Sequence, residues 1–135
     1  ADVTASDRNF YILLNITGLN RIQFGIIDTT STGINIYTDA FGALSTGVWY
    51  HIVAYRNAAT NKIGLWINNS QMTEVTCTNG LKNTLAAFNV LCHKDTTLKA
   101  SLPGLIDELG IWSKVLSSAE VQELYNGGAG NQYPF

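Results

Sequence analysis

The chain has few charged residues and lacks the features that mark several protein classes. Charged residues make up 13% of the 135 positions, and the formal net charge is −2. Eight Lys and Arg residues against ten Asp and Glu provide no basic surface, which argues against sequence-independent nucleic-acid binding. The longest apolar run, Phe10–Leu14, is far shorter than the roughly 20 residues that cross a bilayer. With 46% hydrophobic residues, we expect a globular domain with a buried core.

Cysteine is also scarce, with Cys77 and Cys92 the only two in the chain. Two cysteines are too few for a disulfide framework, and with His93 nearby they are too few for a zinc site. Two alternatives stay open. Both thiols are buried in strands, or they form a bridge that stabilises the fold by roughly 3 kcal/mol.

The strongest pattern in the sequence is the alternation of apolar and polar residues. The pattern is broken by Gly, Asn, Thr and Ser, which favour turns. It predicts eight strands, over residues 8–17, 20–28, 33–38, 48–56, 61–68, 71–77, 88–93 and 104–112. Strands at this spacing are typical of an all-β antiparallel sandwich, here of jelly-roll type.

One short α-helix is predicted near the C-terminus. Ser117 and Glu120 have the spacing of a capping box, in which each side chain bonds the other residue's backbone N–H. Val121, Leu124 and Tyr125 form an apolar stripe at helical spacing. We therefore expect this helix to lie against the sandwich with that stripe inward.

Two stretches carry a resemblance to a known family. Residues 49–56 (WYHIVAYR) and 63–69 (IGLWINN) look like the paired central strands of laminin G-like domains. Residues 104–112 (GLIDELGIW), followed by LSSAEV at 116–121, look like their C-terminal strand and closing helix. The chain thus resembles the pentraxin-like branch of the concanavalin A-like lectin/glucanase superfamily.

The resemblance implies one domain over residues 1–135 that matches the C-terminal three-quarters of the module. Such domains usually begin with further strands, and none is recognised before Phe10. Missing strands would leave sheet edges open, and such edges are prone to aggregation unless they are covered. A neighbouring chain or an assembly is one source of the missing strands.

The carboxylates do not form the pattern expected of a hydrolase. Glycoside hydrolases need two carboxylates that face one cleft, and relatives of this kind place them two residues apart on a strand. None of the four glutamates has an acidic partner at that spacing. Asp107 and Glu108 are adjacent, so a strand would direct them to opposite faces. The sequence therefore predicts a protein that is not an enzyme.

Asp107 is a candidate metal ligand. Its predicted strand face also carries Leu105, Leu109 and Ile111, and a carboxylate among apolar neighbours is costly unless it is paired. The resemblance implies that the matching Asp is often structural, and that in some relatives it helps to hold calcium. Calcium takes six to eight oxygen ligands, so carbonyls and another carboxylate would have to join. A structural, hydrogen-bonded Asp107 is the alternative.

The loops provide the candidate ligand-binding residues, because binding residues concentrate in loops on a rigid scaffold. Tyr37 and Asp39 place an aromatic ring beside a carboxylate, and His93 and Asp95 combine base and acid. Sugar sites pair planar rings with groups of this kind, although ordinary turns carry them too.

The other aromatic residues are expected to be structural. His51 lies in an apolar stretch and is interpreted as a hydrogen-bonded core residue. The three tryptophans, Trp49, Trp66 and Trp112, are predicted to pack in the core or on a sheet, with sugar stacking as the alternative.

These patterns predict a non-catalytic recognition or adhesion module. It would bind a carbohydrate or a protein surface and would belong to a larger protein that is extracellular or displayed on a cell or virion surface. Neither nucleic acid nor membrane insertion is expected, and structural calcium is the one candidate cofactor. The alternative is a structural module, such as a capsid decoration or tail-fibre domain, that acts in assembly and adhesion.

Overall fold

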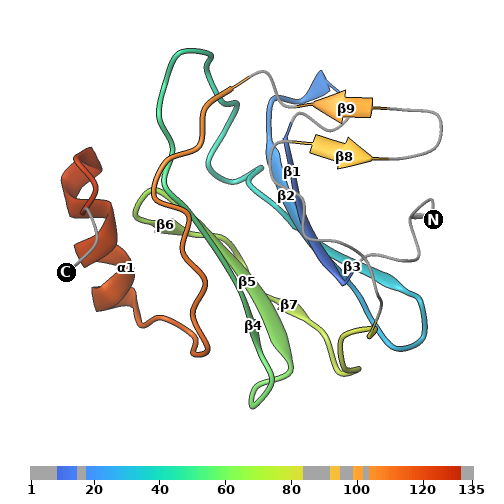
Figure 1. Cartoon of the computed structure of the whole chain (residues 1–135). Coiled ribbons are helices and arrows are strands. Elements are labelled where there is room, and N and C mark those ends of the chain that lie inside the picture. The colour runs from blue at the N-terminus through green and yellow to red at the C-terminus, as the bar shows by residue number, and fades with distance from the viewer. Residues whose placement is uncertain (1–8, 15–17, 84–91, 95–98, 102–103, 132–135) are drawn as a thin grey trace.

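The computed structural model describes residues 9–14, 18–83, 92–94, 99–101 and 104–131, and it consists of antiparallel strands with one helix (Figure 1). The strands are β1 (Phe10–Leu14), β2 (Ile22–Ile27), β3 (Gly33–Tyr37), β4 (Ile52–Asn57), β5 (Lys62–Ile67), β6 (Ser70–Gln71), β7 (Val75–Thr76), β8 (Cys92–Lys94) and β9 (Lys99–Ser101). The helix α1 (Ser118–Tyr125) is followed by a 3₁₀ turn over Asn126–Gly128.

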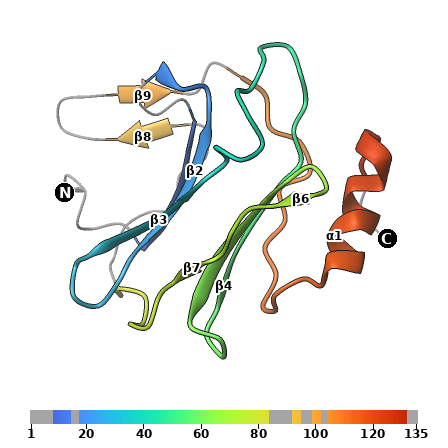
Figure 2. The same ribbon diagram turned by 180° about the vertical axis from the view of Figure 1, so that it is seen from behind.

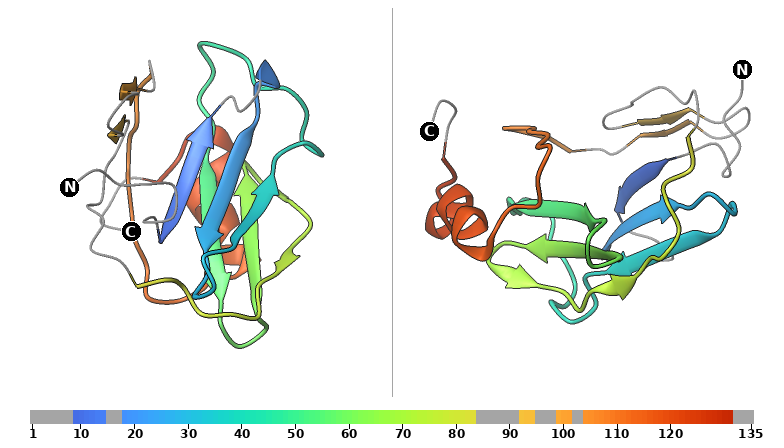
Figure 3. Two further views of the ribbon diagram at one scale, coloured as in Figure 1. Left: turned by 90° about the vertical axis from the view of Figure 1, so that its right-hand side faces the viewer. Right: turned by 90° about the horizontal axis from the view of Figure 1, so that it is seen from below.

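The strands form two main sheets that face each other. One has the order β1-β2-β3, and the other has β4-β5-β6 with β7 also paired to β5. Strands β8 and β9 form a separate hairpin. Seen from behind, α1 lies on the far side of the β4–β7 sheet from β1–β3 (Figure 2). In the view from below, the sheets come together near β3 and β7 (Figure 3), and β3 contacts both β5 and β7. The predicted antiparallel sandwich with one C-terminal helix is confirmed.

The core lies between β2–β3 and β5. Alternate residues of these strands point inward, as the two-residue period of a strand requires. Each is 0 to 5% exposed, and the set is Phe24, Ile26, Ile36, Ile63, Leu65 and Ile67. Burying a side chain of this size contributes about 1.5–3 kcal/mol, so these six residues hold the sheets together.

Cys77 lies at the edge of this core as a free, buried thiol. Its Sγ donates a hydrogen bond to the carbonyl oxygen of Asn79 at 3.3 Å. For Cys77 the buried-thiol alternative is therefore the one observed, whereas the side chain of Cys92 lies outside the described residues.

A tyrosine covers a glycine on each sheet. Tyr11 on β1 pairs with Gly25 on β2, and Tyr55 on β4 pairs with Gly64 on β5. A methyl group at either glycine would overlap the tyrosine ring. Each ring thus takes the space that a side chain in the central strand would occupy.

The largest differences between the observed and the predicted strand bounds are in three places. The strand expected over 48–56 begins at Ile52, and the one expected over 71–77 is divided into β6 and β7. Residues 104–112 form no strand. Alternation gave this stretch a strand pattern, but a strand also needs a neighbour for its hydrogen bonds, and no described strand pairs with it. The hairpin strand β9 was not predicted.

The helix α1 begins as predicted. Ser117 is its N-cap, and the reciprocal bonds of the capping box are both present, from Glu120 N to Ser117 Oγ at 3.3 Å and from Ser117 N to Glu120 Oε2 at 2.8 Å. Val121 is fully buried, so the apolar stripe faces inward. The helix ends at Asn126, whose φ of 45° is left-handed. None of the helices in the described ranges has the length and apolar character to span a bilayer.

Candidate binding site beside the C-terminal helix

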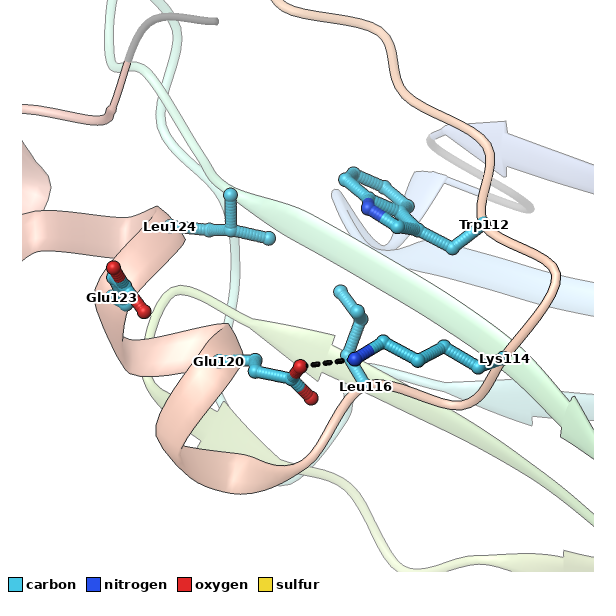
Figure 4. A pocket seen from close by; sticks show the side chains of 6 residues that line it. All are labelled: Trp112, Lys114, Leu116, Glu120, Glu123 and Leu124. Atoms are coloured by element: carbon cyan, nitrogen blue, oxygen red, sulfur yellow. Dashed lines mark hydrogen bonds and ion pairs between the residues drawn. The ribbon is translucent and has the colours of Figure 1, made fainter. Parts of the chain in front are cut away.

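Two adjoining hollows lie where α1 approaches the stretch 107–116. The larger measures about 340 Å³, and the smaller about 290 Å³. The larger is lined by His51, Asp107, Glu108, Leu109, Gly110, Ile111, Trp112, Leu124, Gly130 and Asn131. The smaller is lined by Trp112, Lys114, Leu116, Glu120, Glu123 and Leu124 (Figure 4). Trp112 and Leu124 belong to both, so the two hollows share one wall.

Trp112 is the central aromatic residue of this site. It is 41% exposed, and in Figure 4 its side chain, from the stretch before α1, and that of Leu124, from α1, point toward one another. Gly110 permits this position, because a methyl group there would overlap the indole ring. The expectation that Trp112 packs in the core is therefore wrong. It is also wrong for Trp49, which is 62% exposed, and right for Trp66, which is 8% exposed.

Asp107 and Glu108 both line the larger hollow. Asp107 Oδ1 accepts a hydrogen bond from the backbone N of Glu108 at 2.9 Å. Glu108 has a left-handed φ of 49°, a conformation that costs roughly 1–2 kcal/mol for a residue with a side chain. The expectation that these carboxylates point to opposite faces is wrong, because the chain is not an extended strand here.

His51 is one of the residues that line the larger hollow. Its backbone is fixed to Asn68 by two hydrogen bonds, from His51 N to Asn68 Oδ1 at 3.0 Å and from Asn68 N to His51 O at 2.7 Å. Its ring stacks on Tyr125 of α1, with 6.1 Å between centroids. The ring atom Nδ1 is buried and has no hydrogen-bond partner in the described structure. The prediction of a fully hydrogen-bonded histidine is thus wrong for this atom.

Burial lowers the pKa of His51, and a hydrogen bond with the backbone of Asn68 opposes that shift. Lowering the pKa favours the neutral ring near pH 7. The larger hollow therefore presents a neutral imidazole next to two carboxylates.

Two of the residues that line the smaller hollow, Lys114 and Glu120, form an ion pair. Lys114 Nζ contacts Glu120 Oε1, as Figure 4 shows, and Glu120 also accepts the capping bonds of Ser117. The Lys114 bond and then the Ser117 bonds lower the pKa of Glu120 to about 2. Glu120 is thus a carboxylate that stays ionised and is already paired.

The predicted ligand-binding residues lie elsewhere. Tyr37 is the last residue of β3, and Asp39 follows the strand. Both contact Arg21, whose guanidinium carbon lies 4.1 Å from the centroid of the Tyr37 ring. Arg21 Nη1 also bonds both carboxylate oxygens of Asp39, at 2.8 and 2.7 Å. One face of Tyr37 is therefore occupied by Arg21. His93 lies in β8 with a side chain outside the described residues, and Asp95 lies outside them altogether.

Asp107 is either a calcium ligand or a structural, hydrogen-bonded residue in the sequence analysis, and it accepts the bond from Glu108 N. Across the described ranges, no group of three or more His, Cys, Asp or Glu residues could hold a metal ion. Glu108 is the carboxylate beside Asp107, and calcium would need several more oxygens. The described residues do not complete a calcium site, and calcium there stays a prediction.

The hollows around Trp112 could not be located by sequence reasoning, which treated residues 104–112 as a packed strand. Asp107 was singled out, but for metal. One signal in the sequence could have indicated this site. Residues 105–112 have apolar side chains on both faces of the predicted strand, more than a strand with one buried face requires.

The comparisons with known proteins agree with the fold. The family model described as the concanavalin A-like lectin/glucanases superfamily matches residues 1–122. The chain belongs to this superfamily. The match agrees with the laminin G-like resemblance of the sequence, and the superfamily name itself covers both lectins and glucanases.

No curated protein matches the chain. Among solved structures, the laminin G-like chain is similar to an S-layer domain-containing protein (residues 221–444) from Clostridium thermocellum, with 18% identity and a TM-score of 0.48. The similarity covers 93% of this chain and 66% of that structure.

Proposed function

We propose that this laminin G-like domain is a non-catalytic recognition module that binds carbohydrate in the two hollows around Trp112. The observation that carries the proposal is Trp112 itself, a large aromatic residue exposed where the two hollows meet. We further propose that the domain acts at a surface or outside the cell, as part of a larger protein.

The chemistry around the indole ring supports a sugar as ligand. A sugar ring has a flat face of C–H groups that packs on an aromatic ring, and an edge of hydroxyl groups that both donate and accept hydrogen bonds. Asp107, Glu108 and Asn131 line the larger hollow with acceptors, and Asn131 also carries an amide donor. Few polar groups around an apolar wall are typical of small-ligand sites.

Binding without catalysis is supported by the state of one carboxylate, Glu120. A glycosidase needs a general acid whose pKa is raised so that it holds its proton near neutral pH. Glu120 has the opposite property, because Lys114 and Ser117 lower its pKa to about 2. We therefore expect no turnover of β-glucans by the folded chain, and measurable hydrolysis would contradict this part of the proposal.

A glycan array tests the proposal directly. We expect selective binding by the folded chain, and we expect Trp112→Ala to abolish it. Trp49→Ala is the matched control, since it removes a tryptophan that is more exposed than Trp112, 62% against 41%, and that lines neither hollow. A blank array from folded protein would refute carbohydrate binding, and loss of binding in Trp49→Ala alone would place the site elsewhere.

A structural role in an assembly is a second candidate, favoured by β1. Ile12 and Leu14 are 53% and 44% exposed, although they pair with the buried Phe24 and Ile22 on the same sheet face. A neighbouring molecule that covers β1 would bury this apolar edge. Sedimentation of the purified chain tests this idea, and a monomer at high concentration would count against it.

A further inference from the structure

The charge of the two hollows restricts the ligand. Their walls carry four carboxylates, Asp107, Glu108, Glu120 and Glu123, and a single ammonium, Lys114. Lys114 is already paired with Glu120. Within the described part of the chain, no ion pair joins the other three carboxylates to Lys or Arg. The site therefore has an excess of negative charge around an exposed tryptophan.

Such a surface repels anionic sugars and attracts cationic ones. Like charges brought together at a binding surface cost free energy, so sulfated, sialylated and uronic-acid glycans are disfavoured. A protonated amine gains from Asp107 and Glu108, and near the indole face it also gains a cation–π interaction with Trp112. We propose that the ligand is a chain of amino sugars whose amines are free and protonated, an inference that rests on the proposed function.

The wall that the two hollows share indicates that the ligand is an oligosaccharide rather than a single sugar. Trp112 and Leu124 line both hollows, so a ligand that fills the two must pass across them. Two hollows side by side thus correspond to neighbouring subsites for consecutive sugar units. We expect affinity to rise steeply from the monosaccharide to the trisaccharide.

A lysine-rich peptide would also be attracted by the carboxylates, but it fits the remaining wall less well. A lysine side chain has donors only at its tip and no acceptor. Asn131 lines the larger hollow with an amide that can both donate and accept, and its Nδ2 already donates to the carbonyl of Glu123 at 2.7 Å. A sugar ring that carries one amine and several hydroxyl groups uses carboxylates, amide and indole together.

The decisive comparison uses two trisaccharides with one backbone, the glucosamine trimer and the N-acetylglucosamine trimer. They differ at the amine of each sugar unit, which is charged in the glucosamine trimer and is an uncharged amide in the N-acetylglucosamine trimer. By calorimetry at low salt, we expect the free-amine trimer to bind about tenfold more tightly, and the difference to shrink as salt screens the exposed charges. The double variant Asp107→Asn, Glu108→Gln should remove the preference.

Asp39→Asn is the matched control for that double variant. It also removes a carboxylate, but one that lies beside Arg21 and lines neither hollow. We expect the preference for the free-amine trimer to persist in this variant. Loss of the preference in Asp39→Asn would overturn the assignment to the hollows.

The outcomes separate the inference from the proposed function. Equal binding of both trimers, or stronger binding of sulfated glycans, overturns the amino-sugar inference and leaves carbohydrate binding intact. A trilysine peptide that binds as tightly as the glucosamine trimer and displaces it also overturns the inference. Failure of every sugar to bind the folded chain refutes the proposed function itself.

Discussion

Replacing Gly64 by alanine tests how the β4–β7 sheet is packed. Gly64 lies in the central strand β5, opposite Tyr55 of β4, and a methyl group there would overlap the Tyr55 ring. The ring cannot move freely, because Tyr55 Oη donates to Glu74 Oε1 at 2.6 Å and accepts from Gln71 Nε2 at 2.8 Å. The substitution must therefore displace the ring and break these bonds, or distort β5.

The size of the effect follows from three contributions. Overpacking costs about 1–3 kcal/mol, and each lost hydrogen bond costs about 0.5–1.5 kcal/mol where water can replace part of it. A glycine-to-alanine change returns about 0.4–1 kcal/mol by restricting the unfolded chain. We expect Gly64→Ala to lower the free energy of unfolding by about 1–5 kcal/mol when both hydrogen bonds of Tyr55 are lost.

Urea denaturation measures this difference, and two further variants make it specific. Gly33→Ala is the matched strand control, because its methyl group would meet Ile27 at 3.7 Å, an ordinary contact. We expect Gly33→Ala to change stability by less than about 0.5 kcal/mol. In a Tyr55→Ala background the penalty at Gly64 should disappear, as a double-mutant cycle would show.

The ionisation of Tyr55 gives an independent readout. Burial, with the hydrogen bond to Glu74, raises the pKa of Tyr55 to about 12 from an ordinary value of 10.0. A displaced ring in Gly64→Ala should titrate closer to the ordinary value in an NMR titration. If Gly64→Ala is as stable as the parent protein and the pKa of Tyr55 is unchanged, the proposed packing is wrong.

Three other predictions concern local interactions. Asp28 is buried and accepts bonds from Thr30, Thr32 and Asn79, and its side-chain bonds to Thr30 and Asn79 chiefly lower its pKa to about 2. Because the pKa of Asp28 is lower in the folded state, ionised Asp28 should stabilise the fold above pH 3.8, and this stabilisation should be lost as the pH falls toward 2. In Asp28→Asn, acid-denaturation curves should no longer show this loss of stability. Ser117→Ala should destabilise α1 by about 1 kcal/mol, measured by urea denaturation followed by far-UV circular dichroism. Leu65→Ala should cost about 2–5 kcal/mol in the same measurement, and a cost below 1 kcal/mol would contradict its place in the core.

Local sequence signals predicted the elements whose structure depends on neighbours close in the chain. The capping box of Ser117 and Glu120 specifies the start of α1 through groups three residues apart. Alternation predicted β2, β3 and β5, because one face of each strand is buried against the opposite sheet. In these segments the local pattern and the tertiary packing agree.

Residues 104–112 show why the rest could not be predicted. Their alternation is as regular as that of β5, but strand formation depends on a partner that is distant in the sequence. The exposure of Trp112 depends equally on what packs over it. The left-handed φ of Glu108 has no local signal, because glycine, asparagine or aspartate would be expected at such a position.

Three of the places where sequence reasoning failed lie in one part of the molecule. Glu108 has a strained backbone, Trp112 is exposed, and Nδ1 of His51 has no hydrogen-bond partner among the described residues. All three residues line the larger hollow. Departures from local rules are expected where function competes with stability. Since Trp112 is 41% exposed, its loss should cost far less stability than Leu65→Ala. A folded Trp112→Ala variant that no longer binds sugar would therefore distinguish a binding residue from a structural one.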